Sequence, residues 1–184
     1  MPPFRLPKLW FIAFDYPWHR VFVHVLDTQT DGELARLAGA VPCEYHACDD
    51  SHTVLSQVLR QGEGIGEYIL LLQAGHLPDP DILRQALPYF EPDVAYVQTE
   101  LRSIERPVVD HPLLQLIPMG VTGGDAAPCL GSGAIIRRQA LAALHNADWL
   151  MPVRLGSYLH QAGWRSHLCR ETGVSGGLLL FRNR

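Results

Sequence analysis

The sequence predicts an α/β protein with a doubly wound, mainly parallel sheet, and three observations support this fold class. Strand-like and helix-like segments alternate along the first hundred residues. The run 68–73 is almost continuously apolar, as expected for a strand covered on both faces. A chain of 184 residues with 47% hydrophobic and 18% charged residues can bury a core. We expect a single domain over residues 1–184, with an N-terminal segment at 1–14 and an irregular tail at 172–184.

In the first half, strands and helices are predicted in turn. Strands are predicted from β-branched and aromatic residues, and helices from apolar residues at helical spacing. The predicted strands are 20–27, 41–46, 68–73 and 94–98. The predicted helices are 31–38, ending at Gly39, then 51–61, capped by Ser51, and 79–89, with Pro80 in its first turn.

The second half is less regular. Seven prolines or glycines interrupt residues 99–130, where only a short helical patch at 113–117 is predicted. A strand follows at 131–136, then helices at 138–145 and 153–162, and a last strand at 164–169. The segment 173–184 mixes glycine with an apolar run and has no assignable pattern.

Charge and hydropathy argue against two classes of protein. The net charge is −4 and the basic residues are scattered, so the chain lacks the electrostatic footprint of a nucleic-acid-binding protein. No apolar run approaches the ~20 residues that span a bilayer. The apolar stretch near the N-terminus is short and runs into Asp15 without a small-residue cleavage site. We therefore expect a cytoplasmic protein with no direct membrane span.

The cysteines offer one candidate metal cluster. Cys43, His46 and Cys48 lie close together in the sequence, and His52 follows. Their spacing matches no standard zinc pattern, and four cysteines make no disulfide framework in a domain of this size. We interpret the thiols as buried strand ends and expect no bound metal and no cofactor.

Four segments occur in the order found in one known enzyme family. Each combines glycine, proline or aromatic residues at fixed offsets. The segments are Asp15-Tyr16-Pro17 with the strand ending in Asp27, the frame of His76, Pro78, Pro80 and Asp81, the run from Cys129 to Leu141 with Arg137-Arg138, and Leu159-His160-x-x-Gly163-Trp164-Arg165-Ser166. Together they resemble the cellulose-synthase-like branch of glycosyltransferase family 2, over roughly residues 13–171. The resemblance implies a truncated GT-A fold, the nucleotide-diphospho-sugar transferase-like fold.

The same resemblance shows that the catalytic positions differ. Where the family carries Asp-Ala-Asp-His to bind its metal, this chain carries Gln73, Ala74, Gly75 and His76. Hard divalent cations need carboxylate oxygens, so the metal motif is degenerate. Asp79 and Asp81 are nearby, and we interpret both as helix-capping residues.

The general base is missing in the same alignment. The family's Thr-Glu-Asp motif falls on Leu150, Met151 and Pro152, none of which can accept a proton. The family's first strand and its Gln-x-x-Arg-Trp motif have no counterpart.

Two groups of positions remain as candidates for binding. Asp27 is the one residue left of the family's Asp-Asp-Gly motif, and it is the candidate nucleotide contact. The acceptor side of the family implies a candidate glycan contact at Cys129, Gly131, Ser132, Gly133 and Trp164, although Leu130 is an extra residue in this segment. We interpret His76 and His160 as structural residues.

The leading hypothesis is a non-catalytic pseudoenzyme that serves as an accessory or regulatory subunit of exopolysaccharide or cellulose synthesis. Its partner would be a membrane-bound polysaccharide synthase or a second copy, because a missing first strand exposes a sheet edge. A glycan is a further candidate ligand. The protein would then lie in the cytoplasm, at the inner membrane through its partner.

Two alternatives stay open. One is an active transferase that uses a nucleotide sugar at an atypical or metal-free site built from Asp27, Asp49 and Asp50. The other is a glycan-binding module that uses the acceptor-side residues. Nucleotide binding separates the first alternative from the leading hypothesis, and retention on polymer separates the second.

Overall fold

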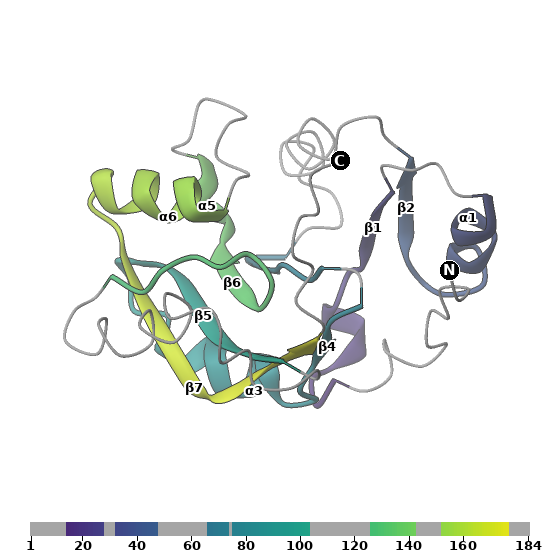
Figure 1. Cartoon of the computed structure of the whole chain (residues 1–184), viewed down its shortest axis with the longest axis horizontal. Helices are drawn as coiled ribbons and strands as arrows, with labels where there is room; N and C mark the ends of the chain where they lie inside the picture. Colours follow the sequence, from purple (N-terminus) through teal and green to yellow (C-terminus); the bar gives the residue numbers. More distant parts are fainter. Residues whose placement is uncertain are drawn as a thin grey trace.

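The computed structural model describes residues 14–27, 32–47, 66–73, 75–103, 126–142 and 152–176. Within these residues the strands form a two-stranded sheet and a five-stranded sheet, which lie apart in Figure 1. The sequence predictions for the helix at 51–61 and the patch at 113–117 fall outside the described residues, as do Ala74, Leu150 and Met151.

The two-stranded sheet is a parallel pair joined by a helix. Its elements are the 3-10 turn η2 (Trp18–Arg20), β1 (His24–Asp27), α1 (Gly32–Ala38) and β2 (Glu44–Ala47). The helix ends where the sequence predicts, and the Gly39 amide donates to the Ala35 carbonyl at 3.1 Å. Both strands begin later than predicted, because η2 precedes β1 and a bend precedes β2.

The five-stranded sheet carries most of the core. Its elements, in chain order, are β3 (Tyr68–Leu70), β4 (Leu77–Pro78), α3 (Ile82–Ala86), η3 (Leu87–Tyr89), β5 (Val94–Ser103), β6 (Ala134–Arg137), α5 (Arg138–Ala142), α6 (Pro152–Gln161) and β7 (Arg165–Gly176). The strand order is β3-β6-β5-β7-β4. The predicted α/β class is therefore confirmed.

The strand directions are mixed, which corrects the expectation of a mainly parallel sheet. β5 and β7 are parallel, whereas β6 is antiparallel to both β3 and β5, and β4 is antiparallel to β7. The reason is the position of β6, which lies between β3 and β5 although it follows both in the sequence. Alternating helix and strand patterns do not reveal such an insertion.

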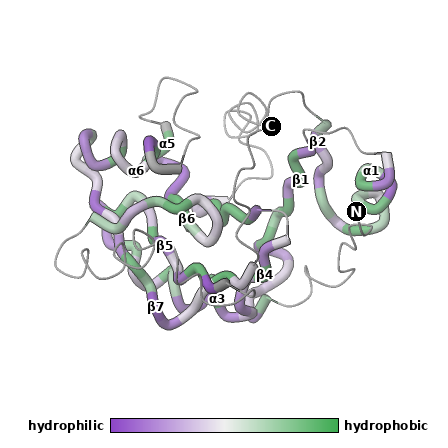
Figure 2. Tube along the Cα trace, in the orientation of Figure 1, coloured by the Kyte–Doolittle hydropathy of each residue, from purple (hydrophilic) through white to green (hydrophobic). Residues whose placement is uncertain are grey.

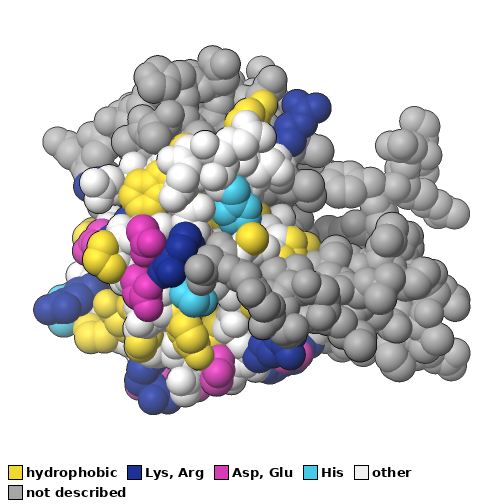
Figure 3. All heavy atoms as spheres, turned by 90° about the vertical axis from the view of Figure 1, so that its left-hand side faces the viewer, with side chains coloured by type: hydrophobic (Ala, Val, Ile, Leu, Met, Phe, Trp, Pro, Cys, Tyr) yellow, Lys and Arg dark blue, Asp and Glu magenta, His cyan; other side chains and the backbone are white. Residues whose placement is uncertain are grey.

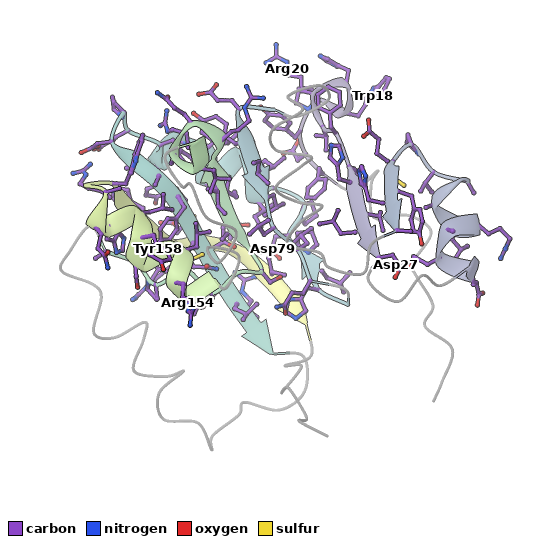
Figure 4. The ribbon with its side chains drawn as sticks, turned by 90° about the horizontal axis from the view of Figure 1, so that it is seen from above. Trp18, Arg20, Asp27, Asp79, Arg154 and Tyr158 are labelled. Carbon is purple, nitrogen blue, oxygen red and sulfur yellow. The ribbon has the colours of Figure 1, made fainter. Side chains whose placement is uncertain are left out.

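Helices cover the sheet on both faces. Leu155 and Leu159 of α6 pack with Tyr96 and Ile136 in one core cluster. The other cluster contains Val97 and Ile135, against which residues of α3 and η3 pack. Hydrophobic residues accordingly follow β5 and β6 through the middle of the molecule (Figure 2), and Arg154 and Tyr158 lie on the exposed side of α6 (Figure 4).

Several boundaries differ from the predictions. The helix predicted from residue 79 begins at Ile82, because Leu77 and Pro78 pair with β7 and the chain turns only afterwards. β5 and β7 extend beyond the predicted strands, to Ser103 and Gly176, because they pair with each other past a bulge. Residues 172–176, which the sequence places in an irregular tail, are thus strand.

The residues just before η2 contact the start of α3 in the five-stranded part of the described structure. The Asp15 amide donates to the Pro80 carbonyl at 2.7 Å, and the Arg84 guanidinium pairs with the Asp15 carboxylate at 2.9 Å. Among the described residues, none of the helices has both the length and the hydrophobicity needed to cross a bilayer.

Candidate functional site

The loop at the predicted metal-motif position, residues 73–76, follows β3, and the Ser132 side chain contacts both of its ends. The Ser132 hydroxyl accepts a hydrogen bond from the Gln73 amide at 3.2 Å and lies 2.8 Å from His76 Nδ1. The His76 amide donates to the Gln73 carbonyl at 3.1 Å, and Gly75 has a φ of 87°, so the loop is a tight turn in which Gly75 adopts the left-handed conformation that favours glycine. Gln73 and Gly75 are exposed, whereas His76 is buried.

His76 fills space at the end of β7. Its ring lies against Gly176, where a Cβ atom would overlap the imidazole. The side chain is 5% exposed, and Ser132 beside it is 2% exposed. This position agrees with the interpretation of His76 as a structural residue, and neither Gln73 nor Gly75 supplies a carboxylate to the loop.

The two aspartates after the loop bind β7 instead of capping α3. Asp79 Oδ2 accepts hydrogen bonds from the Gly173 amide and from Arg102, both at 2.8 Å. Asp81 accepts from the Thr172 hydroxyl at 3.1 Å and from the Gln85 amide side chain at 3.1 Å. Asp81 holds the N-cap position of α3 without a capping side-chain hydrogen bond, so the predicted role is wrong for both residues.

Each of these aspartates has an arginine within ion-pair distance, Arg102 for Asp79 and Arg84 for Asp81. Arg102 pairs with Asp79, and its Nε also donates to Glu100 at 2.7 Å. Hydrogen bonds from Gln85 and then Thr172 lower the pKa of Asp81, with Arg84 adding a smaller effect. Sequence reasoning missed Arg102 and Thr172, because the β5–β7 pairing and its bulge are what bring these side chains next to Asp79 and Asp81.

The candidate glycan segment is packed into the sheet. Cys129, Gly131, Ser132 and Gly133 are all buried, and burial raises the pKa of the Cys129 thiol to about 11. Gly133 has a φ of 76°, and a Cβ there would lie 2.7 Å from Thr99 Oγ1. The glycan contact stays a prediction.

Gln98 anchors this segment from β5. Its side-chain amide donates to the Ser132 carbonyl at 3.1 Å, and its oxygen accepts from the Leu130 amide at 2.8 Å. The Thr99 hydroxyl donates to the Gly133 carbonyl at 2.9 Å. These two fully buried polar side chains fix the backbone around Ser132 and therefore the loop that Ser132 closes.

The segment from Leu159 to Ser166 forms the connection between α6 and β7. Gly163 has a φ of 87°, and the Trp164 amide donates a hydrogen bond to the Leu159 carbonyl at 3.0 Å. The helix therefore ends in a glycine cap. His160 Nε2 lies 2.9 Å from the Ser166 hydroxyl, which donates to the Ala127 carbonyl at 3.1 Å. Half-buried Trp164 packs against the core cluster that contains Leu155 and Leu159 of α6. The described contacts of these residues are structural.

Asp27 lies away from the other candidate residues. It is buried at the end of β1, where the Tyr45 hydroxyl donates to its Oδ2 at 2.6 Å. Figure 4 shows Asp27 in the two-stranded part of the molecule and Asp79 in the five-stranded part. Of the general-base positions, only Pro152 is described, and it is the first residue of α6.

Comparisons with known proteins agree with the resemblance seen in the sequence. The chain is 36% identical over 86 residues to the catalytic component of a UDP-forming cellulose synthase from Dictyostelium discoideum, a match that spans 41% of this chain and 8% of that protein. No protein-family model matches the chain.

Solved structures show the same fold. S. aureus TarS matches with a TM-score of 0.63 and 13% identity, over 93% of this chain and 33% of TarS. Glucosyl-3-phosphoglycerate synthase of Mycobacterium tuberculosis, solved with phosphoglyceric acid, matches with a TM-score of 0.60 and 14% identity, over 96% of this chain and 67% of the enzyme. Both are GT-A glycosyltransferases. The chain therefore has the GT-A fold.

Proposed function

We propose that this chain is a non-catalytic glycosyltransferase-like domain that acts as an accessory or regulatory subunit of polysaccharide synthesis, such as cellulose synthesis. The observation that carries the proposal is the loop at residues 73–76. It has no carboxylate, and the Ser132 contacts to Gln73 and His76 close it.

The electrostatics of the surrounding residues support this proposal. In a GT-A enzyme a divalent cation offsets the charge of the departing nucleotide diphosphate, and carboxylates hold that cation. Here the nearest carboxylate in the sequence, Asp79, already pairs with the Arg102 guanidinium and accepts from the Gly173 amide. A cation at Asp79 would lie close to the Arg102 guanidinium and be repelled by its charge.

A protein partner is part of the proposal. We propose that this chain lies in the cytoplasm and binds either a membrane-bound polysaccharide synthase or a second copy of itself. Support comes from two aromatic residues that precede β1, since Trp18 is 81% exposed and Phe22 is 57% exposed. Figure 4 shows Trp18 and Arg20 pointing away from the ribbon. The face in Figure 3 instead mixes acidic, basic and hydrophobic side chains over its described atoms.

The test is a thermal melt with UDP, UDP-glucose or GDP, each with and without Mg²⁺ or Mn²⁺. A ligand at about a hundredfold over its dissociation constant stabilises a protein by roughly 2.7 kcal/mol, or about 5–10 °C for a chain of this size. We expect no shift beyond that caused by the metal alone. A nucleotide-dependent shift that a chelator reverses would contradict the proposal and favour an active transferase.

A matched variant makes a negative result informative. Gln73→Asp with Gly75→Asp restores both carboxylates at exposed positions of the loop. If the missing carboxylates are the cause, this variant should gain a metal-dependent shift with UDP that the unmodified chain lacks. Aspartate tolerates the positive φ at position 75 better than most residues do.

A further inference from the structure

Three metal-ligating side chains converge on one face of the β1–β2 pair. The parallel register places His24 opposite Glu44 and Leu26 opposite His46. Because side chains alternate along a strand, His24, Glu44 and His46 share one face, and Asp27 and Tyr45 lie on the other. The cluster is therefore separate from the candidate nucleotide contact.

The distances between the three donor atoms match the edges of a tetrahedron. His24 Nδ1 lies 3.2 Å from His46 Nε2 and 3.4 Å from Glu44 Oε2, and His46 Nε2 lies 3.9 Å from the same oxygen. Zinc bonds of ~2.0–2.1 Å at tetrahedral angles put neighbouring ligand atoms about 3.4 Å apart. Two edges agree within a few tenths of an ångström, and the third lengthens toward an exposed carboxylate.

Burial also suits a bound ion. The imidazole side chains of His24 and His46 are 18% and 25% exposed, and their rings stack with centroids 5.5 Å apart. The Glu44 side chain is 64% exposed, so its carboxylate can adjust and solvent can reach the ion. Without an ion, the nitrogen–nitrogen contact is a hydrogen bond in which one imidazole donates to the other.

The cluster differs from the one that the sequence suggests. Cys43, which the sequence groups with His46, is half-buried, and its Sγ donates to the Ala38 carbonyl at 3.5 Å. Cys48 lies outside the described residues.

We propose that His24, Glu44 and His46 bind Zn²⁺, with water in a fourth, solvent-facing position. Two imidazoles and one carboxylate are borderline and hard ligands, which suit Zn²⁺ better than the all-oxygen cations of transferase sites. The ion joins β1 to β2 directly, because His24 comes from one strand and Glu44 and His46 from the other. The site does not depend on the proposed function, since it needs neither nucleotide nor sugar.

The experiment is a titration of the whole chain, kept reduced, with Zn²⁺ by calorimetry, repeated with Co²⁺ by absorption spectroscopy. We expect one ion per chain, and a Co²⁺ spectrum of a tetrahedral site without a thiolate charge-transfer band. His24→Ala and His46→Ala should each weaken Zn²⁺ binding by more than the ~10–100-fold typical of losing a mere supporting contact to a ligand.

Three further variants control for loss of folding and for Zn²⁺ binding at other residues. Glu44→Gln replaces an exposed side chain, so it should weaken binding while the chain stays folded, as circular dichroism would show. His19→Ala, at an exposed position five residues before His24, and Cys43→Ser should leave Zn²⁺ affinity unchanged. Absence of Zn²⁺ binding, binding that survives His24→Ala, or binding that Cys43→Ser abolishes would each overturn the proposal.

Discussion

The five-stranded sheet and the β1–β2 pair differ in how they use their side chains. In β5, every residue from Val94 to Thr99 is completely buried, including Gln98 and Thr99, whose polar atoms bond to neighbouring backbone. In β1 and β2 only Asp27 is buried, and the face opposite it carries two histidines and a glutamate. The larger sheet is stabilised by buried side chains, whereas the smaller sheet has two imidazoles and a carboxylate side by side on one face.

This difference explains which parts of the family motifs serve the fold. Ser132 and the segment from Leu159 to Ser166 act in the described structure through packing and hydrogen bonds to backbone. Gln73 and Gly75, at the predicted metal-motif positions, are instead exposed in the loop after β3.

The largest effect is expected from Gly133→Ala in the larger sheet. A Cβ at this position meets Thr99 Oγ1 at 2.7 Å and Val174 Cγ2 at 2.9 Å, and the backbone has a positive φ. The left-handed conformation and the overlap together should lower the free energy of unfolding by about 3 kcal/mol. Urea denaturation measures this loss.

Gly75→Ala is the matched control for that prediction. Gly75 has a φ of 87°, but a Cβ there would meet nothing within 4 Å. This substitution should cost only about 1 kcal/mol, the conformational part alone. Equal losses in the two variants would mean that the surroundings of Gly133 relax freely and that the larger sheet is not tightly packed.

An intermediate effect is expected from pH at the junction of the larger sheet and α6. Burial lowers the pKa of His160, so the unfolded chain binds a proton at this histidine more readily than the folded chain does. The contribution to stability is complete above the ordinary histidine value of about 6.5 and is lost as the pH falls below it toward the lowered folded pKa.

Urea unfolding of the unmodified chain and of His160→Gln between pH 7 and pH 5.5 tests this. Stability of the unmodified chain should fall more steeply with decreasing pH than that of the variant. Parallel slopes would show that His160 titrates alike in both states, and burial would then not favour the neutral imidazole.

The smallest effect is expected in the β1–β2 pair without metal. Glu44→Gln removes an exposed carboxylate whose ion pairs with His24 and His46 require a protonated imidazole. In the presence of a chelator the free energy of unfolding should change by less than about 0.5 kcal/mol. A loss above 1 kcal/mol, measured by urea denaturation, would show that the smaller sheet also depends on its polar face for folding.

Sequence reasoning succeeded where the signal lies in a short segment or in the identity of a residue. Helices α1 and α6 lie close to their predicted ranges because glycine stops and apolar spacing are properties of short segments. The absence of carboxylates at Gln73 and Gly75 needs no fold to be seen. The order of four motifs was enough to predict the GT-A fold that the comparisons with solved structures show.

Contacts between distant segments required the folded chain. The insertion of β6 between β3 and β5, the pairing of Asp79 with Arg102 and the contact of His24 with His46 join residues from 22 to 69 positions apart. Such contacts depend on loop closure and on which strand packs beside which, and local periodicity constrains neither. Residue types and short-range periodicity therefore predicted most helices and strands and the lack of a carboxylate at residues 73–76. Packing determined which side chains meet.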